Sequence, residues 1–183
     1  MFYTIDIAGL KRDLKLFPVS SDTQIAALIL FGDVELTEHC AKKLLERAPE
    51  FDIILTAEAK SIPLAHEMAR QAGMNDYVVA RKMEKVYMGT TVHANLQSIT
   101  THGDQKLFLG CDDVAKLKGK KVLIVDDVVS TGESLNALKT LADIAGANVV
   151  VEMAILGEGD SQARKDIVTL GDLPLFDAEG NTK

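Results

Sequence analysis

The sequence predicts an α/β fold in which helices flank a twisted, mainly parallel sheet. Short apolar runs rich in β-branched residues occur at 51–55, 77–80, 122–125 and 148–156. Such runs are typical of strands that are buried on both faces. Segments with helical spacing of apolar residues alternate with these runs. This alternation favours a parallel sheet with right-handed crossover connections.

The first half of the chain predicts two helices, a strand and a third helix. Residues 22–31 and 36–48 show apolar residues at helical spacing. The apolar run at 51–55 is the first expected strand. The following helix is expected over 61–70, because Ser61 is a good N-cap residue and Gly73 is a typical stop signal.

The second half predicts three more strands of the sheet. The run at 77–80 is followed by residues 86–110, which are rich in Thr, Ser and Gln. This composition predicts a hairpin beside the main sheet. The central strand is expected at 122–125, with a helix after it that stops at Gly146. The run at 148–156 is the last expected strand, and the tail after it is polar.

Chain length sets the domain organisation. The 183 residues suffice for one α/β domain with a sizeable core. The segments before residue 33 and after residue 156 are too short to be domains. We therefore expect a single domain over 1–183, with a core of about 33–156 and a small hood built from the N-terminal segment and the C-terminal tail.

Composition narrows the possible partners and compartments. Hydrophobic residues make up 47% and charged residues 26% of the chain, which is ordinary for a soluble globular protein. The formal net charge is -7, and there is no cluster of Lys and Arg, so we expect no nucleic-acid partner. The sequence shows neither a signal peptide nor an apolar run of membrane-spanning length. We expect a cytoplasmic protein with no membrane partner.

The segment 122–134 is the most informative part of the sequence. Four apolar residues are followed by Asp126 and Asp127, by a loop of small and hydroxyl residues, and by a helix. Ligands of open α/β sheets bind at the carboxyl ends of the strands. A loop of small residues at a helix N-terminus offers backbone N–H groups to a phosphate. Carboxylates suit sugar hydroxyls or Mg²⁺, so the segment predicts a site for a sugar phosphate.

This segment resembles the phosphoribosyl-pyrophosphate (PRPP) motif of the type I phosphoribosyltransferases. The resemblance implies the fold of that family, with a small hood and a flexible hairpin loop. It also implies that the two acids bind the ribose hydroxyls and that the loop binds the 5-phosphate. The PRPP-binding residues implied are Asp126, Asp127, Val128, Val129, Ser130, Thr131, Gly132, Glu133 and Ser134, together with Ala59.

A second loop follows the expected strand at 51–55. It contains Glu58-Ala59-Lys60, which is similar to the pyrophosphate loop of the adenine phosphoribosyltransferase branch, although that branch usually has Arg where Lys60 stands. In the family this loop often holds a non-proline cis peptide, so we expect one near 57–60. The alternative is an ordinary turn between a strand and a helix.

The cations after the strand at 77–80 form an Arg-Lys-x-x-Lys pattern that resembles the adenine and orotate enzymes. There the pattern reaches the pyrophosphate; a solvated basic edge is the alternative. The following residues, about 86–107, would be a mobile loop that closes over PRPP. The catalytic residues implied are Glu58, Lys60, Arg81, Lys82 and Lys85. Glu58 has two interpretations: it orients the ribose or steadies an oxocarbenium ion, or it forms an ion pair with Lys82.

The expected reaction transfers the 5-phosphoribosyl group of PRPP to adenine, giving AMP and pyrophosphate. Hypoxanthine–guanine enzymes carry an acidic proton relay where this chain has Ser130, which favours adenine. The resemblance implies Mg²⁺ held mainly by PRPP, with Asp126 and Asp127 as possible direct ligands, and a homodimer. Xanthine or orotate transfer, or a non-catalytic PRPP-binding regulator, are the alternatives. Candidate base-pocket residues are Phe17, Val19 and Leu28, for which core packing is the alternative.

Overall fold

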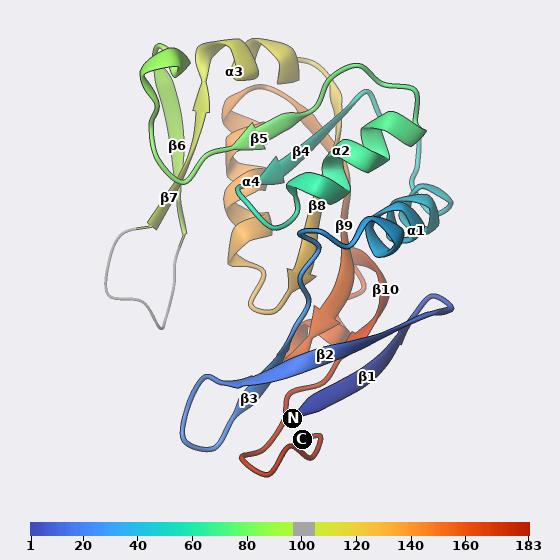
Figure 1. The fold of residues 1–183 in the computed structure, drawn as a ribbon. Helices are drawn as coiled ribbons and strands as arrows, with labels where there is room; N and C mark the ends of the chain where they lie inside the picture. The colour runs from blue at the N-terminus through green and yellow to red at the C-terminus, as the bar shows by residue number, and fades with distance from the viewer. Residues whose placement is uncertain (97–104) are drawn as a thin grey trace.

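A five-stranded parallel sheet forms the centre of the molecule (Figure 1). The structure is a computed structural model, and it describes residues 1–96 and 105–183. The strand order is β10-β9-β8-β4-β5, and every neighbouring pair is parallel. The strands are β4 (Ile53–Ala57), β5 (Val78–Ala80), β8 (Lys121–Val129), β9 (Asn148–Glu158) and β10 (Ile167–Leu173).

Helices cover both faces of this sheet. The pair α1 (Val34–Leu45) and α2 (Ile62–Gln71) contributes to one buried cluster, and α4 (Glu133–Ile144) contributes to the other. Among the described residues, no helix is both long and apolar enough to cross a membrane.

The alternation of side chains along β8 explains why both faces need a cover. Leu123 and Val125 point into the cluster that contains α1 and α2, whereas Val122 and Ile124 point into the cluster that contains α4. Successive side chains of a strand point to opposite faces, so a continuous apolar run must be buried on both. The apolar run thus forms the predicted buried strand.

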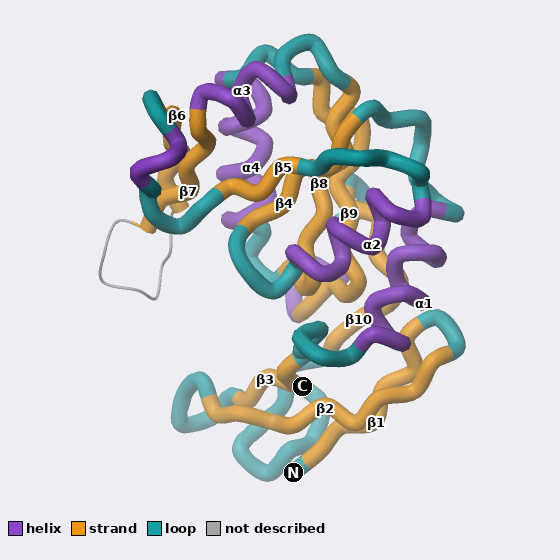
Figure 2. The backbone as a smooth tube through the Cα atoms, turned by 45° about the horizontal axis from the view of Figure 1, so that its top comes forward, coloured by secondary structure: helices purple, strands orange, loops and turns teal. Residues whose placement is uncertain are grey.

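A three-stranded antiparallel sheet lies below one end of the central sheet (Figures 1 and 2). It consists of β1 (Phe2–Ile7), β2 (Leu10–Pro18) and β3 (Gln24–Ala27). The C-terminal tail packs on it: Phe176 forms an antiparallel bridge with Gln24, and its ring centroid lies 4.9 Å from that of Tyr3. The two ends of the chain therefore build one subdomain, which we call the N-terminal sheet.

A two-stranded hairpin stands beside β5. It is formed by β6 (Thr91–Leu96) and β7 (Gln105–Gly110), preceded by the 3₁₀ helix η1 (Val86–Met88) and followed by α3 (Cys111–Leu117). Part of the loop predicted over 86–107, residues 97–104, lies outside the described residues. The mobility of that loop stays a prediction.

The sequence prediction of the fold is wrong at two places outside the candidate site. Residues 22–31 are not a helix, because β3 runs through them and pairs with β2. Ala26, Leu28 and Leu30 are the buried positions, and this alternation has the period of a strand rather than of a helix. The predicted core of 33–156 also ends too early, since β10 extends the parallel sheet into the tail beside β9. A 3₁₀ turn, η2 (Gly159–Ala163), lies between these two strands.

Candidate active site

The site begins where β4 and β8 separate. The two strands pair from Ile53 to Leu55 on β4, and beyond this register they diverge. A hydrogen bond of 2.8 Å from the buried Thr56 hydroxyl to the Val125 carbonyl spans the opening. Ser61, at the start of α2, donates its hydroxyl to the Ala57 carbonyl at 3.1 Å instead of capping the helix with it. These buried bonds fix the loop after β4 against β8.

A cavity of about 440 Å³ opens between the loop after β4 and the acidic end of β8. Its wall brings together residues that are far apart in the sequence, and eight of the predicted site residues are among them. The eight are Glu58, Ala59, Lys60, Lys82, Asp126, Asp127, Val128 and Ser134. The hairpin closes another side of the cavity with Leu96, Gln105 and Leu107.

Asp126 and Asp127 are buried inside β8. Only 9% of Asp126 and 4% of Asp127 are exposed. The strand does not end before the acids, as the sequence predicted, but continues to Val129 through pairing with β9. Burial raises the pKa of Asp126 well above its usual range, and the adjacent charge of Asp127 adds to this shift. The charged form of Asp126 is therefore costly in the free protein.

Lys60 is the cation that faces this pair. Its Nζ lies 2.8 Å from Asp127 Oδ2, although the approach does not have hydrogen-bond geometry. The buried Asp127 Oδ2 thus has a cation beside it but no hydrogen-bond donor among the described residues. Half of the Lys60 side chain (51%) is exposed, so its ammonium is accessible from the cavity.

Glu58 forms an ion pair with Arg81 rather than with the Lys82 side chain. Arg81 Nε lies 3.1 Å from Glu58 Oε2, and the backbone N–H of Lys82 donates to the same oxygen at 3.0 Å. These bonds, the one from Arg81 first, hold the pKa of Glu58 below its usual range. The peptide bond between Glu58 and Ala59 is cis, within the range that the resemblance predicted.

Not all the predicted cations lie at the cavity. Lys82 lines it, whereas the Arg81 guanidinium is taken up by Glu58 and by the hydroxyl of Tyr87. The Arg81 backbone also pairs with Phe108 of β7, which joins this segment to the hairpin. Lys85 follows at the start of η1 and is not part of the cavity wall.

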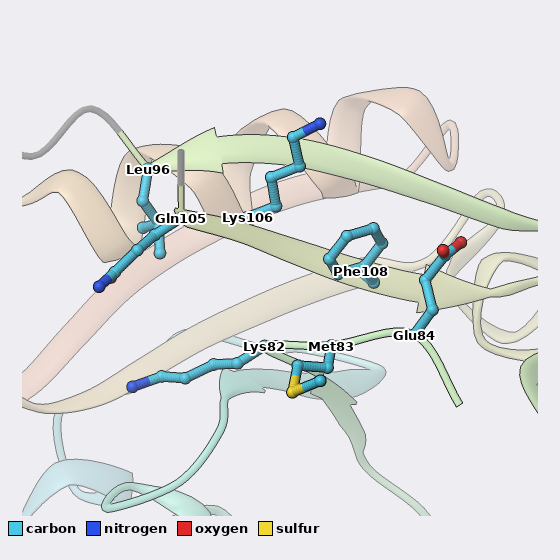
Figure 3. A pocket seen from close by; sticks show the side chains of 7 residues that line it. All are labelled: Lys82, Met83, Glu84, Leu96, Gln105, Lys106 and Phe108. Atoms are coloured by element: carbon cyan, nitrogen blue, oxygen red, sulfur yellow. The ribbon is translucent and has the colours of Figure 1, made fainter. Parts of the chain in front are cut away.

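A second pocket adjoins the first on the side of the hairpin (Figure 3). Its volume is about 590 Å³, and Figure 3 shows Lys82 and Met83 on the segment after β5, on the opposite side of the pocket from the hairpin residues Leu96, Gln105 and Phe108. Lys82 therefore borders both pockets, together with Leu96 and Gln105.

The predicted phosphate loop lies between β8 and α4. Gly132 is the N-cap residue of α4 and has a φ of 81°, a conformation that favours glycine. Ser130 and Thr131 line a hollow of about 360 Å³ whose other wall includes Glu158 and Arg164. The hydroxyl of Ser161 in η2 donates to the carbonyl of Val129, which attaches this wall to the end of β8.

The structure separates the three candidate base-pocket residues. Leu28 is only 2% exposed and belongs to the hydrophobic core. Phe17 and Val19 lie on the N-terminal sheet and the turn after it, and are 43% and 59% exposed. Packing is therefore the role of Leu28 here, while the two exposed residues remain candidates.

Sequence reasoning missed three contributors to this region. Thr56 and Ser61 hold the β4 loop, and Arg164 lies against the phosphate loop. No local pattern marks Arg164, since it stands in the polar tail. The β-branched run that begins at Ile167 was the available signal that another strand, and hence another loop at this edge, follows.

Comparison with known proteins agrees with this geometry. Residues 34–170 match the family described as phosphoribosyl transferase domain. A hypoxanthine/guanine phosphoribosyltransferase of Methanococcus voltae is 31% identical over 137 residues, covering 74% of this chain and 68% of that protein. An adenine phosphoribosyltransferase of Thermosipho africanus is 28% identical over 174 residues, covering 91% and 98%.

The fold is shared with solved structures. The crystal structure of adenine phosphoribosyltransferase from Thermoanaerobacter pseudethanolicus superposes with a TM-score of 0.72, at 21% identity, over 87% of this chain and 95% of that one. The chain belongs to the phosphoribosyltransferase family. It is a type I phosphoribosyltransferase of the purine-salvage type, and hence a pentosyltransferase. Within the family it is similar to the adenine phosphoribosyltransferase group.

Proposed function

We propose that this enzyme transfers the 5-phosphoribosyl group of PRPP to adenine and releases pyrophosphate. The observation that supports the proposal best is that the Glu58-Ala59-Lys60 loop and the Asp126–Asp127 pair line the same cavity. One wall has the composition of a pyrophosphate loop and the other suits a ribose. A sugar that carries a phosphate on one side and a pyrophosphate on the other would span the cavity between the ends of β4 and β8.

The acidic pair would hold the ribose. Carboxylate oxygens accept strong, charge-assisted hydrogen bonds from hydroxyls. Asp127 Oδ2, which has no hydrogen-bond donor among the described residues, would accept one from the 2- or 3-hydroxyl. Fixing the ribose in this way positions C1 for attack by a base nitrogen.

Lys60 and Lys82 would then meet the leaving pyrophosphate. In the free protein Lys60 lies beside Asp127. Once the ribose hydroxyls satisfy Asp127, the Lys60 ammonium can turn to the pyrophosphate, where negative charge develops as the C1–O bond breaks. The reaction passes through an oxocarbenium-like state and requires no nucleophilic side chain.

Mg²⁺ is implied by the family, and the residues present fit it. Mg²⁺ prefers oxygen ligands and is usually bound by one or two carboxylates together with substrate phosphates. The carboxylates of Asp126 and Asp127, which line the cavity, are suited to act as such ligands. When bound with PRPP, the ion would neutralise charge on the pyrophosphate.

Adenine is the proposed base. Ser130 stands where the hypoxanthine–guanine enzymes have an acid, and a serine is a poor proton relay without a partner. Ser130 is exposed at the rim of the hollow. The relatives named above differ in their base, so the choice depends on this residue and on the Glu58-Ala59-Lys60 loop. The proposal also includes a cytoplasmic homodimer.

Pyrophosphate release from Mg²⁺-PRPP with each base in turn tests the function. We expect kcat/KM for adenine to exceed that for xanthine by at least about a hundredfold, or ~2.7 kcal/mol of transition-state binding. Hypoxanthine, guanine and orotate should also react more slowly than adenine. PRPP binding without turnover of any base would indicate the regulator instead. Light scattering after gel filtration tests the dimer.

A further inference from the structure

The phosphate loop contains no cation of its own. Residues 128–134 include one charged side chain, Glu133, and the loop follows the acidic pair directly. A phosphate monoester carries a charge of about −1.5 to −2 at neutral pH. Backbone N–H groups and the dipole of α4 attract it, but the helix end contributes only about half a charge. Because the nearby carboxylates repel a phosphate, we expect a cation from another element to contribute to its binding.

Arg164 is placed to supply that cation. It follows η2, and its guanidinium lies so close to Gly132 that a Cβ built on this glycine would overlap Nη1. It also lines the hollow whose opposite wall is Ser130 and Thr131. Of the described residues that line this hollow, Arg164 is the only cation, and Glu158 and Asp160 are the acids.

Asp166 orients the guanidinium. Arg164 Nε donates to Asp166 Oδ1 at 3.1 Å, and Nη2 donates to Oδ2 at 2.6 Å. Nη1 is left without a hydrogen bond within the described parts of the chain, and it is the nitrogen beside Gly132. The hydrogen bond from Arg164 lowers the pKa of Asp166 to about 2, so the pair stays charged at neutral pH.

We infer that Arg164 binds the 5-phosphate of PRPP through Nη1, while Asp166 holds the other edge of the guanidinium. The inference rests on the proposed function and adds a binding residue from outside the loop motif. A guanidinium can serve an acid and a phosphate at once because its donors form a rigid planar fork. The 5-phosphate is remote from C1, so Arg164 should act on the KM for PRPP more than on kcat.

Calorimetry with two ligands tests the inference. Arg164→Gln should weaken binding of ribose 5-phosphate by about fivefold or more. Binding of Mg²⁺-pyrophosphate, which needs the other end of the cavity, should stay within about twofold of wild type. Arg164→Lys keeps the charge without the fork and should lose about two- to threefold. Arg47→Gln is the matched control, because it removes the same charge at an exposed position.

The outcomes separate the role of Arg164 from a structural one. Unchanged or tighter binding of ribose 5-phosphate by both Arg164 variants would overturn the inference. Equal loss of both ligands would mean that Arg164 only supports the fold, which thermal unfolding of the variants would confirm. If Arg164→Gln does not fold, the Lys variant decides. Wild-type protein that binds neither ribose 5-phosphate nor PRPP would instead refute the proposed function itself.

Discussion

At the scale of single residues, an acid that is proposed to bind the ligand lowers the stability of the free protein. Asp126 is buried with Asp127 at its side, and its pKa is raised because burial disfavours the charged form. A group whose pKa is higher in the folded state makes the protein less stable as the pH rises. The charge of Asp126 therefore lowers the stability of the free protein, and a bound ligand that pairs with this charge would offset the loss.

Asp126→Asn should make the free protein more stable at pH 7.5, by about 1 kcal/mol, because it removes a buried charge while keeping an oxygen acceptor. The gain should shrink as the pH falls toward about 4, where the wild-type carboxyl is protonated in the folded state and about half protonated in the unfolded chain. Urea unfolding at the two pH values measures this. Asp143→Asn, at an exposed position of α4, is the control. A variant that is less stable at both pH values would contradict the account.

The acidic pair should also decide PRPP affinity. Replacing Asp126 and Asp127 together by Asn keeps their shape but removes charge-assisted hydrogen bonds to the ribose. We expect PRPP to bind at least about tenfold more weakly, a loss of ~1.4 kcal/mol. Calorimetry with Mg²⁺-PRPP checks this, with Asp143→Asn again as the control. Unchanged affinity would remove the pair from the ribose site.

At the scale of elements, ion pairs from Arg12 to Asp33 and to Glu35 join the N-terminal sheet to the central fold, and the pair with Asp33 also involves a helix cap. Asp33 is the N-cap of α1 and accepts from the N–H of Leu36 at 3.0 Å. Arg12 of β2 reaches the same carboxylate, with Nε 2.7 Å from Oδ2 and Nη2 3.0 Å from Oδ1. The hydrogen bond from Arg12, first among the causes, lowers the pKa of Asp33.

Asp33→Asn removes the ion pair with Arg12 but keeps the helix cap, because Asn caps a helix as well as Asp does. The variant should lose about 1 kcal/mol of stability at pH 7. A group with a lowered pKa stabilises the fold above its ordinary pKa of about 3.9 and loses that effect as the pH falls through the folded value. Urea unfolding should therefore show the difference in stability between the two proteins shrinking as the pH falls below about 3.9. Asp33→Ala should lose about 1 kcal/mol more through the cap.

At the scale of the whole molecule, the sequence predicted what local patterns encode. The parallel sheet, the existence of its first four strands along the chain, and the meeting of the loop after β4 with the end of β8 follow from apolar runs and from the motif 122–134. Strand ends in a parallel sheet share one edge, so these parts of the site could be inferred from the sequence alone.

Contacts between distant segments could not be inferred in this way. β3 was mistaken for a helix because its small residues fit either period until β2 pairs with it. β10 was missed because it is stabilised by β9, and with it the position of Arg164 beside Gly132. The partner of Glu58 was also missed, since Arg81 is fixed by pairing with Phe108 of the hairpin. Tertiary packing, not local propensity, decides each of these.

The most direct test of the account is a competition among bases in one reaction. Adenine, hypoxanthine, guanine and xanthine are supplied at equal concentration with limiting Mg²⁺-PRPP, and the nucleotide products are separated by chromatography. The product ratio gives the ratio of kcat/KM values, independent of the active fraction of enzyme. The account predicts that AMP is the dominant product and exceeds the xanthine nucleotide by at least about a hundredfold. Predominance of any other nucleotide would contradict it.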